Sequence, residues 1–344
     1  MLIKVLVVEN SALVRQVLCD IIRADKAFLL VGAASDAHMA KRMVQEFRPD
    51  VIALDVEMPK VSGVRFLEVM MKAMPTPVVM ISALSKQKAN DILRALELGA
   101  VDYMAKPKIG ITSGDKNYSY VFTQKLKAAA RSTPSSPTHA RECQHAELRK
   151  TSTAKVIGIG ASTGGAEAIK DVIMHFPSNA PATVMSLHMP PGFTTSYAHR
   201  LNQLCKIAVK EAKGGEQLLP GNAYLAPGNR HLMVEKKGAN YWLKLDDGPK
   251  VTGHKPSVDV MFSSLAKHAK KNAVGVLLTG MGKDGAKGMT EMKQTGAVTF
   301  CQDKNSSLIY GMPRVAIELG AATHIVSLSH MSDAILDTIE AMSS

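Results

Sequence analysis

The chain has 344 residues, of which 46% are hydrophobic and 21% are charged, and its mean hydropathy is +0.01. At about 150 residues per domain, these values predict two soluble globular domains and argue against a single compact one. Lys and Arg outnumber Asp and Glu by 42 to 30, and the resulting charge of +12 raises nucleic acid or another acidic surface as a partner.

The cysteine pattern and the apolar runs exclude several classes of protein. Cys19, Cys143, Cys205 and Cys301 are far apart, so neither a disulfide framework nor a zinc site is indicated. No segment reaches 18 uninterrupted apolar residues, and the apolar amino-terminal run contains Lys4. We therefore expect a cytoplasmic protein with reduced thiols, without signal peptide or membrane insertion.

Residues 1–107 alternate short apolar runs with amphipathic stretches. The stretches at 12–24 and 36–47 have the apolar spacing of helices. Five such βα units in a row predict a doubly wound parallel sheet. The apolar runs predict buried strands at 2–8, 28–33, 51–54, 77–81 and 101–104.

Residues 108–153 have the composition of a linker. They include the run RSTPSSPT at 131–138, and one helix is expected over 121–131. Strand patterns resume at 156–159, 183–187 and 273–278, again between helices. A second α/β domain, with a Rossmann-like doubly wound parallel sheet, is therefore expected over 154–344.

The net charge is unevenly divided among these parts. It is +2 in residues 1–107, +5 in 108–153 and +5 in 154–344, so the linker has the densest excess. Neither a helix-turn-helix motif nor a basic stripe with interleaved aromatic residues is present. We therefore expect no nucleic-acid partner.

Polar residues follow the predicted strands of the first domain. In a parallel sheet the carboxyl ends of the strands meet at one edge, where ligand chemistry gathers. An acidic cluster with a divalent cation, a nucleophilic carboxylate and an ammonium group can accept a phosphoryl group. Alternatively, each residue only caps its strand. The residues concerned are Glu9, Asn10, Asp55, Ser82 and Lys106.

This set resembles the receiver domain of bacterial response regulators. The resemblance implies that Asp55 is the phosphoacceptor, that Ser82 and Lys106 sense the phosphoryl group, and that Tyr103 is the switch aromatic. The matching stretches are VLVVENS at 5–11, LDVEMP at 54–59 followed by Gly63, ISAL at 81–84, and GAVDYMAKP at 99–107.

One departure concerns the metal site. The resemblance implies that Mg²⁺ is held by Glu9, Asn10 and Asp55. The family usually has two consecutive Asp residues where this chain has Glu9 and Asn10. Removing one negative charge about 4 Å from a cation removes on the order of 4 kcal/mol at an effective dielectric of 20, and less with solvent exposure. We expect weakened Mg²⁺ binding and altered phosphorylation, with a metal-independent docking domain as the alternative.

The second domain has a Gly-rich turn after its first strand. The sequence GIGASTGG at 158–165 runs into a helical pattern at 166–174. A dinucleotide-binding loop is one interpretation, but its third glycine is out of register with G-x-G-x-x-G. A strand-to-helix turn that presents Ser162 is favoured, because the adjacent amides and the helix dipole stabilise negative charge.

A base and a carboxylate for Ser162 follow two other strands. His188 comes directly after the next strand and can remove the serine proton if adjacent strands bring the two together. Asp284, in the run LLTGMGKDG at 277–285, is the candidate that fixes the imidazole tautomer. The Met281 N–H is the candidate oxyanion donor.

Six motifs in this domain resemble the chemotaxis protein-glutamate methylesterase family. The resemblance implies that Ser162, His188 and Asp284 hydrolyse glutamate methyl esters of methyl-accepting chemoreceptors, with Thr163 and Met281 lining the site and no cofactor for hydrolysis. It also implies deamidation of receptor glutamines and a chemotaxis histidine kinase as phosphodonor, and nothing requires more than a monomer. The motifs are GASTGG at 160–165, HMPPGFT at 188–194, LAPGNRH at 225–231, PSVDVMF at 256–262, TGMGKDG at 279–285, and QD at 302–303 with GMP at 311–313.

Two other functions remain open at this point. The chain is a regulatory binding module if its receiver docks a partner and the hydrolase domain is incidental. It is a nucleotide-binding protein if the Gly-rich turn holds a phosphate. Most other histidines, His254 among them, have no ligand spacing beyond chance and are interpreted as surface or structural residues, whereas His231 lies in a family motif and is placed near the cleft.

Overall fold

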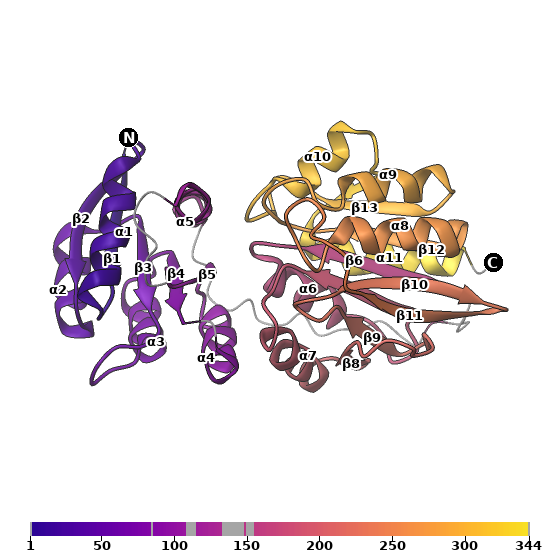
Figure 1. The fold of residues 1–344 in the computed structure, drawn as a ribbon, viewed down its shortest axis with the longest axis horizontal. Helices are drawn as coiled ribbons and strands as arrows, with labels where there is room; N and C mark the ends of the chain where they lie inside the picture. The colour runs from indigo at the N-terminus through magenta and orange to yellow at the C-terminus, as the bar shows by residue number, and fades with distance from the viewer. Residues whose placement is uncertain (1, 84, 108–114, 133–147, 149–154, 343–344) are drawn as a thin grey trace. The chain divides into compact units, whose positions relative to one another are not determined.

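The structure is a computed structural model that describes residues 2–83, 85–107, 115–132, 148 and 155–342. The chain divides into two compact units, Met1–His139 and Ala140–Ser344, which are coloured indigo to magenta and magenta to yellow in Figure 1. Each unit has its own parallel sheet covered by helices. The expected α/β class with two doubly wound sheets is therefore confirmed.

The first unit is built on a five-stranded sheet in the order β2-β1-β3-β4-β5, and all its strand pairs are parallel. The central strands are buried on both faces, which explains their continuous apolar sequence. The strands are β1 (Ile3–Val8), β2 (Phe28–Ala34), β3 (Val51–Asp55), β4 (Val78–Ser82) and β5 (Asp102–Ala105).

Four helices of this unit begin at side-chain caps. Ser11, Asp36, Ser62 and Asp115 each accept a hydrogen bond from a backbone N–H of the first turn, which satisfies donors that the helix itself leaves free. The helices are α1 (Ala12–Ala24), α2 (Ala37–Phe47), α3 (Gly63–Ala73), α4 (Lys86–Glu97) and α5 (Lys116–Ala129).

Helix α5 belongs to the first domain and not to a linker. It begins at Lys116, five residues before the expected helix start, and it packs on β3, β4 and β5. Phe122 and Leu126 are fully buried in the core of the first sheet. The domain therefore extends past residue 107, because α5 covers apolar sheet surface that would otherwise face water. The predicted linker residues 133–147 and 149–153 lie outside the described part of the chain.

The second unit contains a seven-stranded parallel sheet in the order β14-β13-β12-β6-β7-β9-β8. The chain moves from β6 to β7 on one side and later returns to β12 on the other side of β6. This reversal makes the carboxyl ends of β6 and β12 the switch point, where α/β proteins bind ligands. The strands are β6 (Val156–Ala161), β7 (Ala182–Leu187), β8 (Ala208–Glu211), β9 (Asn222–Leu225), β12 (Ala273–Leu277), β13 (Val298–Gln302) and β14 (His324–Val326).

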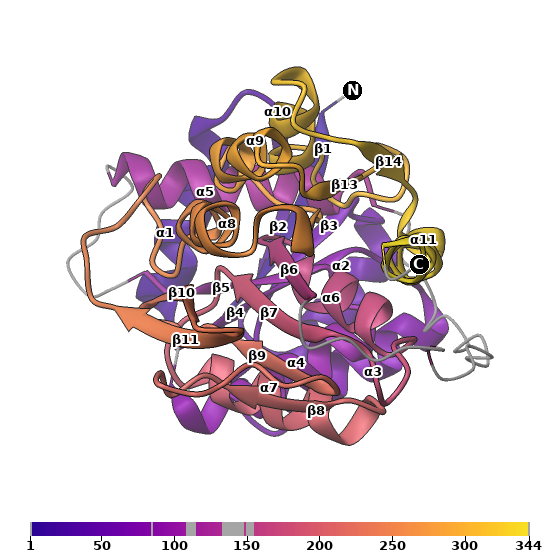
Figure 2. The same cartoon turned by 90° about the vertical axis from the view of Figure 1, so that its right-hand side faces the viewer.

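Helices cover both faces of this sheet. Helices α8 and α9 pack together on one face, and α6 and α11 pack together on the other, as Figure 2 shows. An antiparallel hairpin, β10 (His231–Lys237) with β11 (Asn240–Asp246), packs on α8 and was not predicted. The helices are α6 (Gly165–Ile173), α7 (Phe193–Leu204), α8 (Val258–His268), α9 (Ala286–Gln294), α10 (Met312–Glu318) and α11 (Leu328–Ala341).

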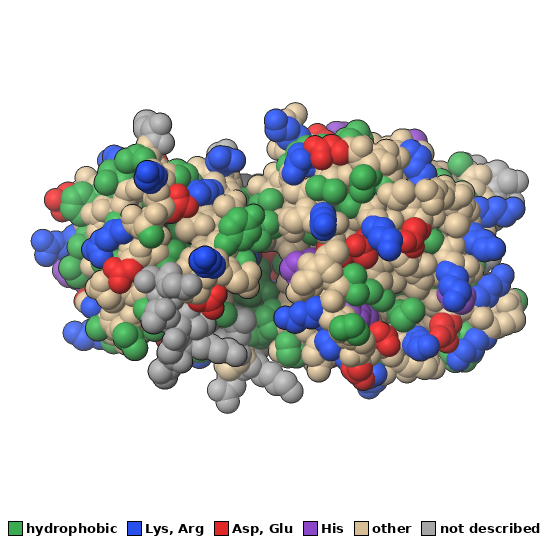
Figure 3. Space-filling view, turned by 45° about the horizontal axis from the view of Figure 1, so that its top comes forward, with side chains coloured by type: hydrophobic (Ala, Val, Ile, Leu, Met, Phe, Trp, Pro, Cys, Tyr) green, Lys and Arg blue, Asp and Glu red, His purple; other side chains and the backbone are tan. Residues whose placement is uncertain are grey.

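The surface carries mixed charge. On the face shown in Figure 3, Lys and Arg side chains are interspersed with acidic ones. Several form exposed ion pairs, such as Lys210 with Glu216 at 2.9 Å and Arg314 with Glu318 at 2.7 Å. No helix among the described residues has both the length and the apolar composition that a bilayer crossing requires.

Candidate active site

Ser162 lies in the turn between β6 and α6, as predicted. Its backbone N–H donates to the Thr279 carbonyl at 3.0 Å, and its own carbonyl accepts from the Gly165 N–H at 2.7 Å. Gly164 caps α6 with a φ of 75°, a left-handed conformation that glycine adopts without steric cost. These contacts fix the serine at the amino terminus of a helix, where negative charge is stabilised.

A second glycine allows the neighbouring strand to approach Ser162 closely. A Cβ atom added to Gly280 would lie 2.2 Å from the Met312 sulfur and 2.9 Å from the Ser162 Cβ. Any side chain at this position would therefore displace the serine. The glycines of the TGMGKDG run thus bring the end of β12 against the nucleophile turn.

His188 contacts both Ser162 and Asp284. Strands β6 and β7 pair so that Ala161 lies opposite Leu187, which places the next residues, Ser162 and His188, at the same level. The Nδ1 atom of His188 lies 3.0 Å from the Ser162 Oγ, and its Nε2 atom lies 2.7 Å from Asp284 Oδ2. The structure therefore brings the three predicted residues together at the switch point of the sheet.

Asp284 is buried and accepts hydrogen bonds from four donors. Its Oδ2 accepts from His188 and from the Val258 N–H at 2.7 Å. Its Oδ1 accepts from the Ser257 hydroxyl at 2.7 Å and from the Asp259 N–H at 3.1 Å. Burial acts to raise the pKa of Asp284, but these hydrogen bonds, led by that from His188, hold it well below its usual range.

This arrangement can activate a serine hydroxyl. With the Asp284 carboxylate at Nε2, the favoured tautomer carries its proton on Nε2, and Nδ1 is free to accept the proton of Ser162. The His188 side chain is only 8% exposed and Asp284 is 1% exposed, which strengthens their interaction relative to water. The geometry supports acyl transfer through a serine ester.

The two residues predicted to line the site adjoin Ser162 and Gly280 in the chain. Thr163 is buried, and its carbonyl accepts a hydrogen bond from the Thr279 hydroxyl at 3.0 Å. Met281 is half-buried in the loop after β12, and among the described residues no partner is found for its backbone N–H. That N–H is therefore available, and its role as an oxyanion donor stays a prediction.

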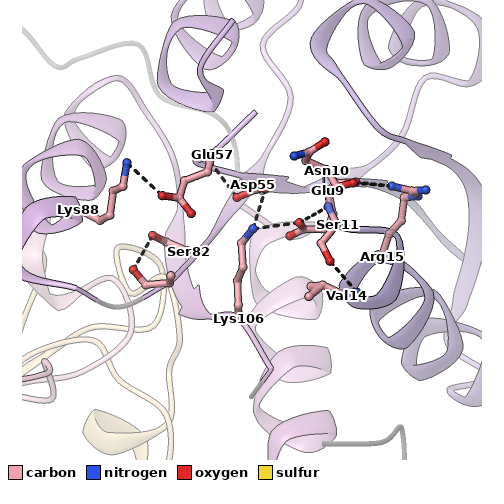
Figure 4. Close-up of polar contacts among 11 residues, drawn as sticks. Glu9, Asn10, Ser11, Val14, Arg15, Asp55, Glu57, Ser82, Lys88 and Lys106 are labelled. Carbon is pink, nitrogen blue, oxygen red and sulfur yellow. Dashed lines mark hydrogen bonds and ion pairs between the residues drawn. The ribbon is translucent and has the colours of Figure 1, made fainter. Parts of the chain in front are cut away.

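The first unit places its predicted site residues at one edge of the sheet (Figure 4). The Lys106 Nζ atom lies 2.8 Å from Asp55 Oδ2 and 2.9 Å from Glu9 Oε1. Glu9 and Asp55 are fully buried. Gly63 is required beside them, because a Cβ atom there would lie 1.9 Å from the Asp55 carbonyl oxygen.

The other predicted receiver residues are less closely joined. Ser82 is buried at the end of β4, where its hydroxyl donates to the Ala83 carbonyl at 3.2 Å. Tyr103 is half-buried on β5, and the ammonium group of Lys125 lies 5.6 Å from its ring centre. Asn10 is exposed. The Asp55 carboxylate is therefore contacted by the Lys106 ammonium group at 2.8 Å and by the Glu57 N–H, which donates to Oδ1 at 2.9 Å.

Glu9 is the unusual member of this site. Burial, and then repulsion from Asp55, raises the pKa of Glu9 to about 7, although Lys106 and the Ser11 N–H oppose the shift. Its Oε2 atom is buried without a hydrogen-bond partner among the described residues. Such an atom suits a cation, but the described part of the chain offers no cluster of three or more His, Cys, Asp or Glu side chains for one.

Comparison with known proteins identifies the family that each unit matches. Residues 157–335 match the CheB methylesterase family, and residues 5–110 match the response regulator receiver domain. The protein-glutamate methylesterase/protein-glutamine glutaminase of Methylobacillus flagellatus is 49% identical over 351 residues, covering 100% of this chain and 98% of the relative. The chain belongs to the CheB methylesterase family.

Two further relatives agree with this membership. The protein of the same name from Thiobacillus denitrificans is 50% identical and covers 98% of this chain and 97% of its own length. The CheB methylesterase catalytic domain of Thermotoga maritima is 36% identical, with a TM-score of 0.52, and it covers 54% of this chain and 98% of its own length. Membership in the CheB methylesterase family extends over the whole chain.

Two further histidines lie near the triad of this family member. His231 is buried and structural: its Nδ1 accepts from the Ser257 N–H at 3.1 Å, and its Nε2 lies 2.9 Å from the Pro249 carbonyl. His254 stacks on His188, with ring centres 3.6 Å apart and planes 5° apart. Only the short spacing of His254 before Ser257 and the PSVDVMF motif could have signalled its position.

Proposed function

We propose that the chain hydrolyses glutamate methyl esters on methyl-accepting chemoreceptors and deamidates receptor glutamines, and so serves chemosensory adaptation. The single observation that carries this proposal is the hydrogen-bonded line from Ser162 through His188 to Asp284. The names of relatives at 49% and 50% identity supply the substrate class.

Hydrolysis of the methyl ester would proceed in two steps, acylation and deacylation of Ser162. Ser162 Oγ attacks the ester carbonyl while His188 Nδ1 takes its proton, and the Met281 N–H stabilises the oxyanion. The C–O bond to the leaving group then breaks, and His188 returns the proton to release methanol. In the second step water attacks the acyl ester and gives a proton to His188 Nδ1. The C–O bond to Ser162 Oγ then breaks, His188 returns the proton to that oxygen, and the free glutamate acid leaves.

Deamidation uses the same groups with a different leaving group. The side-chain carbonyl of glutamine is attacked by Ser162, and His188 protonates the departing nitrogen so that ammonia leaves. Hydrolysis of the common acyl intermediate then yields glutamate. The assay is release of methanol from methylated receptor and of ammonia from the glutamine form. A chain that released neither product would refute the proposed function.

The receiver is proposed to control this activity through phosphorylation of Asp55 by a chemotaxis histidine kinase. The buried Asp55 carboxylate would attack the phosphoryl donor, and Lys106 would neutralise an incoming oxygen. Mg²⁺ bound by Glu9, Asn10 and Asp55 would supply further neutralisation of charge. The unpartnered Glu9 Oε2 suits such a cation, whereas the neutral amide of Asn10 weakens the site.

Phosphodonor treatment tests this regulation. With Mg²⁺ and a small acyl phosphate, the wild-type rate of methanol release should increase. In Asp55→Ala the ratio of treated to untreated rate should fall to about one, because the acceptor carboxylate is gone. Asp20→Ala, an acidic residue on α1, is the matched control and should keep the wild-type ratio. Equal ratios in all three proteins would leave the receiver as a docking domain.

Restoring a carboxylate should strengthen the metal site. Asn10→Asp is expected to tighten Mg²⁺ binding about tenfold to a hundredfold. The added carboxylate attracts the cation, but beside a partly solvated ion its interaction energy is only a fraction of that in a buried site. Calorimetric titration with Mg²⁺ measures this. Gln45→Glu makes the same charge change on the exposed surface of α2 and should bind like the wild type. Identical affinities in all three proteins would show that Asn10 does not contact the ion.

A further inference from the structure

The imidazole of His188 is held by two hydrogen bonds that leave one motion free. One is made at Nδ1, toward Ser162, and the other at Nε2, toward Asp284. They hold two points of the ring, but the imidazole can still rotate about its Cβ–Cγ bond within the tolerance of these hydrogen bonds. Such a rotation swings Nδ1 and Nε2 out of line with Ser162 and Asp284, and a contact on the face of the ring resists it.

His254 provides a contact on that face. The two rings are 3.6 Å apart between centres and almost parallel, at 5°. At this distance the His254 ring lies in van der Waals contact with one face of His188, and such a rotation would drive an edge of His188 into it. No other ring among the described residues stacks on His188.

The backbone around His254 is held in place. Val251 and His254 exchange two backbone hydrogen bonds, at 3.0 and 2.9 Å, across a turn in which Thr252 and Gly253 have positive φ. Three residues after His254, Ser257 is held by His231 and donates to Asp284. The same segment therefore fixes the carboxylate at one nitrogen of His188 and the ring that covers its face.

We propose that His254 is a positioning residue, which by stacking on His188 holds the imidazole in the plane that joins Ser162 to Asp284. This inference rests on the proposed function and adds a residue to it. The neutral ring also suits a His188 that becomes positively charged after it takes the serine proton.

The charges around His254 support a neutral ring. Burial, and then the neighbouring His188, lowers the pKa of His254 to about 4, with Lys250 acting in the same direction and Asp284 opposing it. At neutral pH the stacked ring therefore carries no charge that would oppose protonation of His188.

Two substitutions separate stacking from other roles. His254→Ala removes the ring, and we expect kcat for methanol release to fall about tenfold with KM unchanged, in line with the measured contribution of aromatic pairs. His254→Phe restores a flat ring without nitrogens and should return kcat to within about threefold of the wild type. His330→Ala, an exposed histidine on α11, is the matched control and should match the wild type.

A second measurement needs no substrate. ¹⁵N NMR of the His188 ring in the full chain should show the Nε2-protonated tautomer in the wild type and in His254→Phe, and averaged signals in His254→Ala. Wild-type kcat and an unchanged His188 spectrum in His254→Ala would overturn the proposal. Equal losses in the Ala and Phe variants, or a change in KM alone, would also overturn it. A wild type that released no methanol would refute the proposed function, while the NMR comparison would still decide the stacking.

Discussion

Ser162→Ala is expected to slow methanol release from a methylated receptor by about 10⁴-fold or more, because no other group can form the acyl intermediate. The hydroxyl lies 3.0 Å from the His188 Nδ1 atom and has no substitute in the turn. The substitution removes one half-buried oxygen and keeps the Cβ atom, so the thermal unfolding midpoint of the chain should stay nearly unchanged.

The control for this variant is Ser329→Ala, an exposed serine near the start of α11. It should retain the wild-type rate, and mass spectrometry should detect no acyl adduct on Ser329. Retention of most activity in Ser162→Ala would contradict the assignment of the nucleophile. The neighbouring Thr163 would then be the next hydroxyl to test, although it is buried.

Asp284→Asn is expected to reduce kcat by about 10⁴-fold while the fold is retained, because an amide favours the wrong tautomer of its histidine partner. All four groups around the carboxylate are hydrogen-bond donors. An Asn side chain must turn its NH₂ group toward two of them. If that group faces His188, the imidazole places its proton on Nδ1, where it can no longer accept from Ser162.

A measurement of the unfolding midpoint distinguishes the loss of kcat from a loss of the fold. The NH₂ group leaves at least one donor without an acceptor, and a buried unsatisfied donor costs about 1–3 kcal/mol. The unfolding midpoint in urea should therefore fall, but the chain should remain folded at neutral pH. Asp337→Asn, which lies on α11, controls for the loss of one charge. An Asp284→Asn variant with near wild-type kcat would exclude Asp284 from the triad.

The sequence predicts the strands of the first sheet well. The five strands of the first sheet start and end within one or two residues of the expected limits. The reason is that its central strands, β1, β3 and β4, are apolar along almost their whole length. In the second sheet, β8, β9, β13 and β14 were missed, although β9 and β13 are largely buried.

The place of helix α5 in the first domain, and the β10-β11 hairpin, were missed for another reason. The sequence of α5 is only weakly amphipathic and follows a Gly-rich stretch, so its place in the first core depends on the sheet it covers. The hairpin has strands of alternating polarity in a domain otherwise made of parallel units. In both cases tertiary contacts, and not local propensity, decide the outcome.

The candidate triad could be predicted because each member follows a buried strand. Strand ends are visible in the sequence, and the parallel sheet brings them to one edge. His254 follows no strand, and it reaches His188 through a turn whose path depends on the hairpin β10-β11 and on α8. Its short spacing before Ser257 and the PSVDVMF motif is the one sequence signal of this position.

The separation of the triad along the chain has a consequence for synthesis. Ser162 and His188 are on neighbouring strands, but Asp284 is 96 residues beyond His188, and its strand pairs directly with β6. A ribosome adds the serine and the histidine well before the carboxylate that orients them. A nascent or truncated chain that ends before β12 would contain Ser162 and His188 but would lack the Asp284 carboxylate. Domains also fold largely as units, so such a chain would lack part of its fold. Esterase activity should therefore appear only when the catalytic domain has been made nearly in full.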